Sequence, residues 1–182
     1  FTLRETQTGE IIDDVANGKS ELGIIYLSEH NENVLAKLIR KNDLVFEELF
    51  TAKPHVFISR EHPLAGRELL TVEELKPYPY LVFEQGERNS FYFSEEFLSV
   101  LDLPKNIQVR DRATLFNLLI GLNGFTVSSG VIDSKLNGPG IIAKSLAMDC
   151  HMRIGLLTKK NRLPSRYASS YMEAIRRHLS ID

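Results

Sequence analysis

The chain has 182 residues, of which 43% are apolar, so it can bury a core of ordinary size. Its 22 basic and 24 acidic residues leave a net charge of −2, which argues against nucleic-acid binding by this chain alone. A single cysteine cannot form an internal disulfide, and no apolar run reaches the roughly 20 residues that cross a bilayer. We therefore expect a protein of the reducing cytoplasm without membrane contact.

The first forty residues predict alternating strands and helices. Residues 1–5 alternate like a strand, and Thr8 can cap a helix that ends at Asn17-Gly18. Residues 21–27 form a short apolar run, which predicts a strand buried on both faces. A strand, a helix and a strand with short links predict a βαβ unit in a parallel sheet. The apolar faces of this helix and the next are Ile11, Ile12, Val15 and Ala16, and then Val34, Leu35, Leu38 and Ile39 before a break at Asp43.

Two extended stretches without a helix between them follow, residues 44–51 and residues 54–59. They predict either an antiparallel excursion or a crossing between two lobes. Thr71 and Glu74 form a capping box for a short helix over 72–76. After it the alternation returns, with predicted strands at 80–83, 107–110, 125–128 and 141–146, helices at 90–101 and 112–122, and a turn at 137–140.

A second long extended stretch, residues 150–159, leads into a last helix that starts at Pro164. One face of that helix carries Tyr167, Tyr171, Ile175 and Leu179. The order of elements predicts an α/β fold of two Rossmann-like lobes joined by two crossover strands, with a cleft between them. Residues 1–51 and 148–182 form lobe one, and residues 52–147 form lobe two. A ligand is expected at the strand C-termini that face the cleft.

Three segments resemble the LysR-type transcription regulators. Ser59-Arg-Glu-His-Pro-Leu-Ala-Gly66 is similar to the family's Ser-x-x-His-Pro-Leu loop between a strand and a short helix. Asn17-Gly-Lys-Ser-Glu-Leu-Gly-Ile-Ile25 is similar to its Gly-x-x-Asp-Leu-Gly-Ile element, with Glu21 where Asp is usual. Residues 118–125 are similar to its helix that ends in a Gly-x-Gly turn, here lengthened by Asn123, and Ser128-Ser129-Gly130 stands where the family often has Leu-Pro. The resemblance runs from residue 1 to about residue 179.

The resemblance implies a bilobal, type 2 periplasmic-binding-protein-like fold that senses a small effector and dimerises within a bacterial transcription regulator. The family pattern begins with a winged helix-turn-helix, a linker helix and the first strand and helix of lobe one. We expect these elements to be absent from this sequence. The regulator would then contact DNA only through the N-terminal domain that is absent here. A homodimer, and a tetramer at full length, is also implied. An effector in the cleft would shift the lobe angle or the dimer packing.

Candidate ligand residues lie at two helix starts and one strand. Thr8 and Thr114 place hydroxyls where free N–H groups favour an anion, although plain helix capping explains each of them equally well. Tyr26 matches a position where the family often has a ligand-contacting polar residue, and a packing tyrosine is the alternative. The expected ligand is a small polar anion, such as an amino acid, an organic acid or a sulfur compound.

Further candidates follow two strands of the second lobe. Thr126, Ser128 and Ser129 gather hydroxyls at one strand end, which a local turn would also explain. Gln85 follows the strand 80–83 and can donate to a ligand or lie in a solvated loop.

No cofactor, metal site or catalytic set is expected. The five histidines are scattered, and His62 has no nucleophile partner that the sequence identifies, so its loop is interpreted as structural. Cys150 is interpreted as an inert thiol in an apolar strand. Two other classes stay open: an extracytoplasmic solute-binding protein of a transporter, and an enzyme on the same scaffold, such as a dehydratase or a transferase. The sequence shows no convergent acid, base and nucleophile for the latter.

Overall fold

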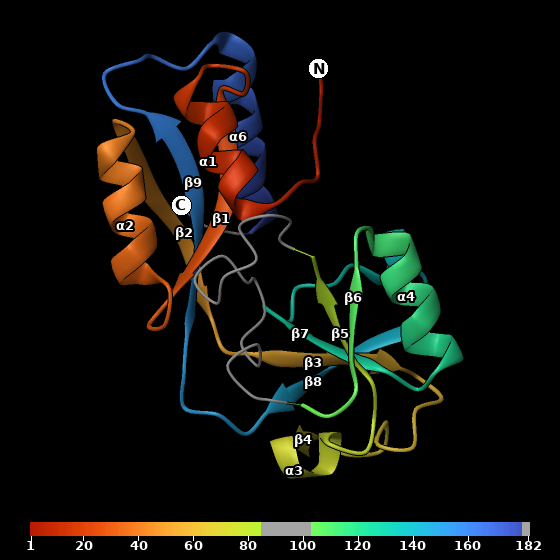
Figure 1. Ribbon diagram of the computed structural model, residues 1–182. Coiled ribbons are helices and arrows are strands. Elements are labelled where there is room, and N and C mark those ends of the chain that lie inside the picture. The colour runs from red at the N-terminus through yellow and green to blue at the C-terminus, as the bar shows by residue number, and fades with distance from the viewer. Residues whose placement is uncertain (85–102, 180–182) are drawn as a thin grey trace. The chain divides into compact units, whose positions relative to one another are not determined.

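The computed structural model describes residues 1–84 and 103–179. The chain forms two compact units: unit 1 consists of Phe1–Thr51 and Arg153–Asp182, and unit 2 of Ala52–Met152. The polypeptide therefore leaves unit 1 after Thr51 and returns to it after Met152. Figure 1 shows each unit as a sheet with helices packed against it. The predicted helix over 90–101 lies outside the described residues.

Unit 1 contains a three-stranded sheet in the order β1-β9-β2. Its strands are β1 Leu22–Ser28, β2 Leu44–Ala52 and β9 Met152–Lys159. Its helices are α1 Thr8–Ala16, α2 Glu32–Lys41 and α6 Arg166–His178 (Figure 1). The middle strand β9 thus comes from the C-terminal part of the chain. Cys150 is buried but precedes β9, so its predicted place within a strand is wrong.

The predicted strand over residues 1–5 is wrong, because this segment pairs with no described strand. Phe1 and Leu3 are exposed, and the Phe1 ring contacts Tyr167 edge-on with centroids 5.3 Å apart. Alternation makes a strand only where a neighbour accepts and donates the backbone hydrogen bonds. The βαβ unit predicted at the start of the chain therefore lacks its first strand.

Helix α1 covers one face of β1. Its predicted apolar residues Ile12 and Val15 are buried, and Gly23 of β1 lies so close that a Cβ there would be 2.5 Å from Ile11 Cγ2. On that face of β1 Ile25 is also buried, whereas Ile24 on the opposite face is exposed. The prediction that this strand is buried on both faces is therefore wrong.

Residues of β2 and β9 interlock around the Phe46 ring. A Cβ at Gly155 would lie 2.5 Å from Phe46 Cζ and 2.4 Å from the Glu47 carbonyl oxygen, so the aromatic ring fills the space that a side chain would take. Two residues earlier on β9, Arg153 lies over the same ring, with Cζ 5.8 Å from its centroid. Arg153 also donates to Glu48 of β2 at 2.7 Å and to Glu32 of α2 at 2.5 Å. One guanidinium thus joins a strand and a helix of unit 1.

Helix α6 begins after Ser165, two residues later than the predicted start at Pro164. Ser165 is the N-cap: its Oγ accepts from the Ala168 N–H at 3.2 Å and donates to Glu21 at 2.7 Å. The Ser165 hydroxyl, followed by its backbone N–H, lowers the pKa of Glu21. Glu21, which stands where the LysR pattern has Asp, therefore ties the start of β1 to the start of α6.

Unit 2 contains a six-stranded sheet in the order β4-β8-β3-β7-β5-β6 (Figure 1). Its strands are β3 His55–Ser59, β4 Leu69–Leu70, β5 Tyr80–Phe83, β6 Asn106–Val109, β7 Phe125–Ser128 and β8 Ile141–Leu146. Its described helices are α3 Val72–Leu75, α4 Arg112–Gly121 and α5 Ser134–Asn137. The capping box predicted at Thr71 and Glu74 is confirmed, with both reciprocal hydrogen bonds present.

The sheet of unit 2 is mixed. Strand β3 is antiparallel to β7 and β8, whereas β5 is parallel to β6 and β7. Residues opposite one another on paired strands share a face, so Phe57, Thr126 and Ala143 lie on the same side of the sheet. That side carries the core beneath α4, made of Phe57, Leu81, Val109, Leu115, Leu119 and Ile141.

The loop around His62 is structural, as predicted. The His62 side chain is 3% exposed and its ring packs against Tyr78 with centroids 4.3 Å apart. Nδ1 accepts from the Leu64 N–H at 3.0 Å, so Nε2 carries the proton and donates to the Asn123 carbonyl oxygen at 3.0 Å. Burial lowers the pKa of His62. The ring therefore joins this loop to the turn that ends α4.

Candidate ligand-binding site

The carboxyl ends of three strands in unit 2 form the best candidate site. Strands β5, β6 and β7 are parallel to one another, so all three end at one edge of the sheet. Glu84, Arg110 and Ser129 are the residues that follow these three strands. In open α/β sheets this edge is where ligands bind. We refer to it below as the carboxyl edge.

Glu84 and Arg110 form a two-pronged ion pair at the carboxyl edge. Arg110 Nε donates to Glu84 Oε2 at 2.5 Å, and Nη2 donates to Oε1 at 3.0 Å. The register that pairs Phe83 with Val109 brings the two residues together, and the Glu84 N–H donates to the Val109 carbonyl oxygen at 2.8 Å. The hydrogen bond from Arg110 lowers the pKa of Glu84, and that from Glu84 raises the pKa of Arg110.

Asp111 fills the start of α4. Its Oδ1 accepts from the Thr114 N–H at 2.8 Å, and its Oδ2 accepts from the Thr114 hydroxyl at 2.7 Å. These two bonds, the backbone one first, lower the pKa of Asp111. Thr114 therefore takes part in the cap, which was the alternative left open by the sequence, and a carboxylate already occupies this helix start. Ligand binding by Thr114 stays a prediction.

Replacing Asp111 by alanine is expected to lower the melting temperature by roughly 2–4 °C, because two N-terminal groups of α4 lose their acceptor. Asp111→Asn keeps a side-chain acceptor and should retain most of the stability. Because the pKa of Asp111 is lowered in the folded state, its contribution is present above its unfolded value near about 4 and is lost as the pH falls through the folded value. Thermal denaturation of the three proteins between pH 3 and 7 checks this. A difference between wild type and Asp111→Ala that does not shrink as the pH falls from 7 to 3 would contradict the assignment.

The hydroxyls at the end of β7 have different surroundings. Thr126 is 6% exposed and lies opposite Phe57, on the core side of the sheet. Ser128 is half-buried, lies opposite His55 and shares that face. Ser129 Oγ accepts from the Val131 N–H at 3.4 Å, which is the local turn role that the sequence left open. Of the three, Ser128 is therefore best placed at the carboxyl edge for a ligand.

The remaining candidates lie elsewhere. Thr8 and Tyr26 belong to unit 1, and Gln85 lies outside the described residues. Thr8 is buried as the first residue of α1, whose N-cap is Gln7 without a side-chain cap bond, so the prediction that Thr8 caps this helix is wrong. Tyr26 is half-buried within β1, two residues before the strand ends. Their roles in ligand binding stay predictions.

The interpretation of the sequence missed Glu84 and Arg110. The signal that could have found them is a charged residue directly after the predicted strand 80–83 and another at the end of the predicted strand 107–110. The described residues contain no group of three or more side chains arranged to hold a metal ion. Nor do they include a helix long and apolar enough to span a membrane.

Comparison with known proteins gives consistent results. Residues 1–180 match the family described as LysR substrate binding domain. The chain is 24% identical over 184 residues to the HTH-type transcriptional regulator SsuR of Burkholderia cenocepacia, covering 99% of this chain and 56% of that protein. The chain thus spans little more than half the length of this relative.

Solved structures share the fold. The effector binding domain of QuiR in complex with shikimate superposes with a TM-score of 0.65 at 22% identity, covering 98% of this chain and 80% of that one. A putative LysR family transcriptional regulator from Pseudomonas aeruginosa superposes with a TM-score of 0.63 at 16% identity, covering 97% of this chain and 59% of that one. At these identities the likeness concerns the fold, which is of the type 2 periplasmic-binding-protein-like class that the sequence predicted.

Proposed function

Because this chain belongs to the LysR substrate binding domain family, we propose that it senses a small-molecule effector within a bacterial transcription regulator. The family match over residues 1–180 is the observation that carries the proposal. The relative SsuR, which is named an HTH-type transcriptional regulator, supports the regulatory context, and the QuiR domain in complex with shikimate supports effector binding by this fold.

Features of unit 2 support a small polar ligand. Its carboxyl edge combines an exposed guanidinium at Arg110, the carboxylate of Glu84 and the hydroxyl of Ser128. Such groups hold a polar molecule by directed hydrogen bonds.

The proposal includes the other properties predicted from the sequence. The effector is held between the two lobes and shifts the lobe angle or the dimer packing. The chain acts as a homodimer, and as a tetramer together with a DNA-binding domain, in the cytoplasm and without catalytic turnover. An extracytoplasmic solute-binding protein would share this fold, but the family match favours the regulator.

Effector binding is expected to raise the melting temperature of the chain. A ligand at 100 times its Kd stabilises a folded protein by about 2.7 kcal/mol, because it binds the folded state alone. We would screen amino acids, organic acids including shikimate, and sulfur compounds by thermal shift, and then measure each hit by calorimetry. The matched control is the methyl ester or amide of each acid, which should give a smaller shift.

Two outcomes would contradict the proposal. One is that no compound of these three classes binds at millimolar concentration. The other is that a compound which binds is converted to a product at a rate proportional to protein concentration, which would favour the enzyme alternative. Expression of a reporter gene controlled by the full-length regulator then separates a regulator from a transport protein. Only a regulator changes transcription when the effector is added.

A further inference from the structure

The Arg110 guanidinium has a free edge. A guanidinium carries five N–H donors arranged as a fork. Glu84 takes the Nε–H and one Nη2–H, and no other partner for Arg110 is found in residues 1–84 and 103–179. Both N–H groups of Nη1 and the second one of Nη2 remain, and together they form the outer edge of the fork. That edge has the spacing that receives the two oxygens of one carboxylate.

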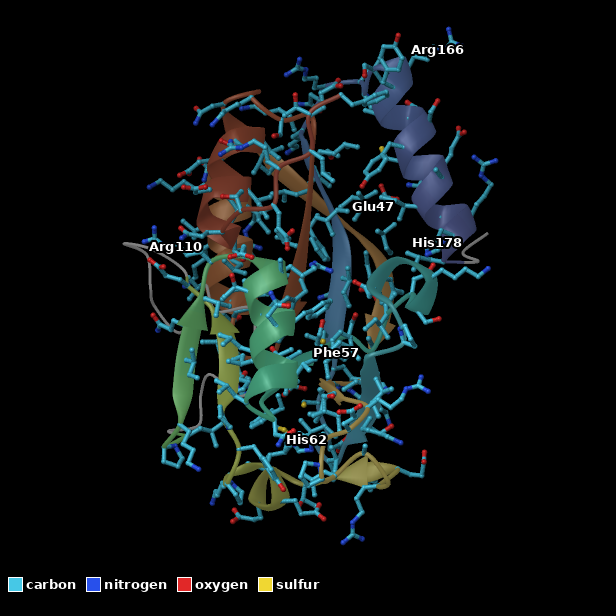
Figure 2. All side chains as sticks on the ribbon, turned by 90° about the vertical axis from the view of Figure 1, so that its right-hand side faces the viewer. Glu47, Phe57, His62, Arg110, Arg166 and His178 are labelled. Atoms are coloured by element: carbon cyan, nitrogen blue, oxygen red, sulfur yellow. The ribbon has the colours of Figure 1, made fainter. Side chains whose placement is uncertain are left out.

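The free edge is open to solvent. The Arg110 side chain is 81% exposed, whereas that of Glu84 is only 26% exposed, so the carboxylate is the inner partner and the guanidinium the outer one. Figure 2 shows Arg110 at the tip of β6, where the strand ends. A ligand can therefore approach Arg110 without displacing Glu84.

Neighbouring charges restrict which anion fits. Both carboxylate oxygens of Asp111 accept hydrogen bonds from Thr114, so Asp111 does not compete with a ligand for Arg110. Its negative charge also disfavours an anion at the start of α4. Glu84 already balances the charge of Arg110. An anion at the free edge is repelled by the Glu84 carboxylate on the inner side of the same guanidinium, and this repulsion doubles for a dianion such as sulfate or phosphate. A planar, singly charged carboxylate fits the fork, and its repulsion by Glu84 is half that of a dianion.

We propose that the outer edge of Arg110 binds the carboxylate of the effector, and that Glu84 makes this site selective for a monocarboxylate over a dianion. This inference rests on the proposed function and deepens it, because it names the chemical class of the effector. Arg110 is the binding residue, and Glu84 is a specificity-determining residue that acts through charge and through the donors it occupies.

The test uses the whole chain with acetate, sulfate and acetamide as probes, at constant ionic strength set with sodium chloride. Side-chain Nε–H resonances of arginine and backbone amides of residues 110–114 are followed by NMR titration. We expect acetate to give saturable shifts there, sulfate to bind at least 10-fold more weakly, and acetamide to give none. Arg110→Lys keeps the charge but loses the fork, and it should weaken acetate binding at least 10-fold. Glu84→Gln should raise sulfate affinity about 10-fold and acetate affinity by less.

Lys144→Gln is the matched control, because Lys144 pairs with Glu68 at 3.3 Å in the same unit and should leave all titrations unchanged. The inference is overturned if Arg110→Lys retains acetate binding, or if Glu84→Gln leaves the ratio of sulfate to acetate affinity unchanged. An effector from the wider screen that binds wild type and Arg110→Lys equally well would overturn this inference alone. Absence of any effector for the wild type would instead contradict the proposed function.

Discussion

Replacing Gly155 by alanine is expected to destabilise unit 1 by about 3 kcal/mol, because the new methyl group has no space on the β9 strand. A Cβ at this position would lie 2.4 Å from the Glu47 carbonyl oxygen and 2.5 Å from Phe46 Cζ, well inside van der Waals contact. The first of these atoms belongs to the backbone of the neighbouring strand β2, so the strain is relieved only by moving a strand. Urea unfolding followed by circular dichroism measures the loss.

Two variants separate the causes of that loss. Gly66→Ala is the matched control, since a Cβ there meets nothing within 4 Å, and it should change stability by less than about 0.5 kcal/mol. Phe46→Leu combined with Gly155→Ala should recover part of the loss if the ring is the main obstacle, and none of it if the backbone is. A Gly155→Ala protein as stable as the control would show that the two strands are farther apart than described.

Replacing His62 by alanine is expected to cost about 3 kcal/mol. The change leaves the Leu64 N–H and the Asn123 carbonyl oxygen without their partner, and each unpaired buried group costs about 1–3 kcal/mol. It also removes a ring that packs against Tyr78, which adds a cavity. His62→Asn can still accept from the Leu64 N–H, so its loss should be smaller. Unfolding in urea at pH 8 compares the three proteins.

The pH dependence of stability gives an independent check on His62. Its pKa is lowered in the folded state by burial, so the unfolded chain binds the proton more readily. Stability should therefore be full above the unfolded value near about 6.5 and should fall as the pH drops below it towards the folded value. His62→Asn should remove this part of the slope. An unchanged slope in that variant would contradict the assignment.

Elements with local signals were predicted well. The helix α3 has a capping box within four residues, so its start at Val72 was predicted, and it ends one residue earlier than expected. The strands β7 and β8 are short apolar runs between turns, and their bounds match the structure. The α/β fold class was also predicted, from the order of the elements and the LysR motifs together. The failures needed partners far away in the sequence. Residues 1–5 have the alternation of a strand but no described neighbour, and the bond from Ser165 at the start of α6 to Glu21 joins residues 144 positions apart.

The candidate site was predicted in part. The sequence indicated hydroxyls at the end of β7, and Ser128 does lie at the carboxyl edge of unit 2. It did not indicate that Glu84 and Arg110 meet, because they are 26 positions apart and are joined only by the parallel register of β5 and β6. A sequence shows which residues follow strands, but the order of strands in the sheet decides which of those residues are neighbours.

The place of β9 in the sheet of unit 1 has a consequence for synthesis on the ribosome. Unit 2 is one uninterrupted segment, so all of its strands have been translated by the time Met152 is added. In unit 1, β1 and β2 flank β9 and need it between them, yet residues 152–159 are translated more than a hundred residues after β2 begins. Domains generally fold as units during synthesis, the earlier-completed one first. The first fifty residues must therefore wait, with their strand edges unpaired by β9, while the middle of the chain completes its own sheet.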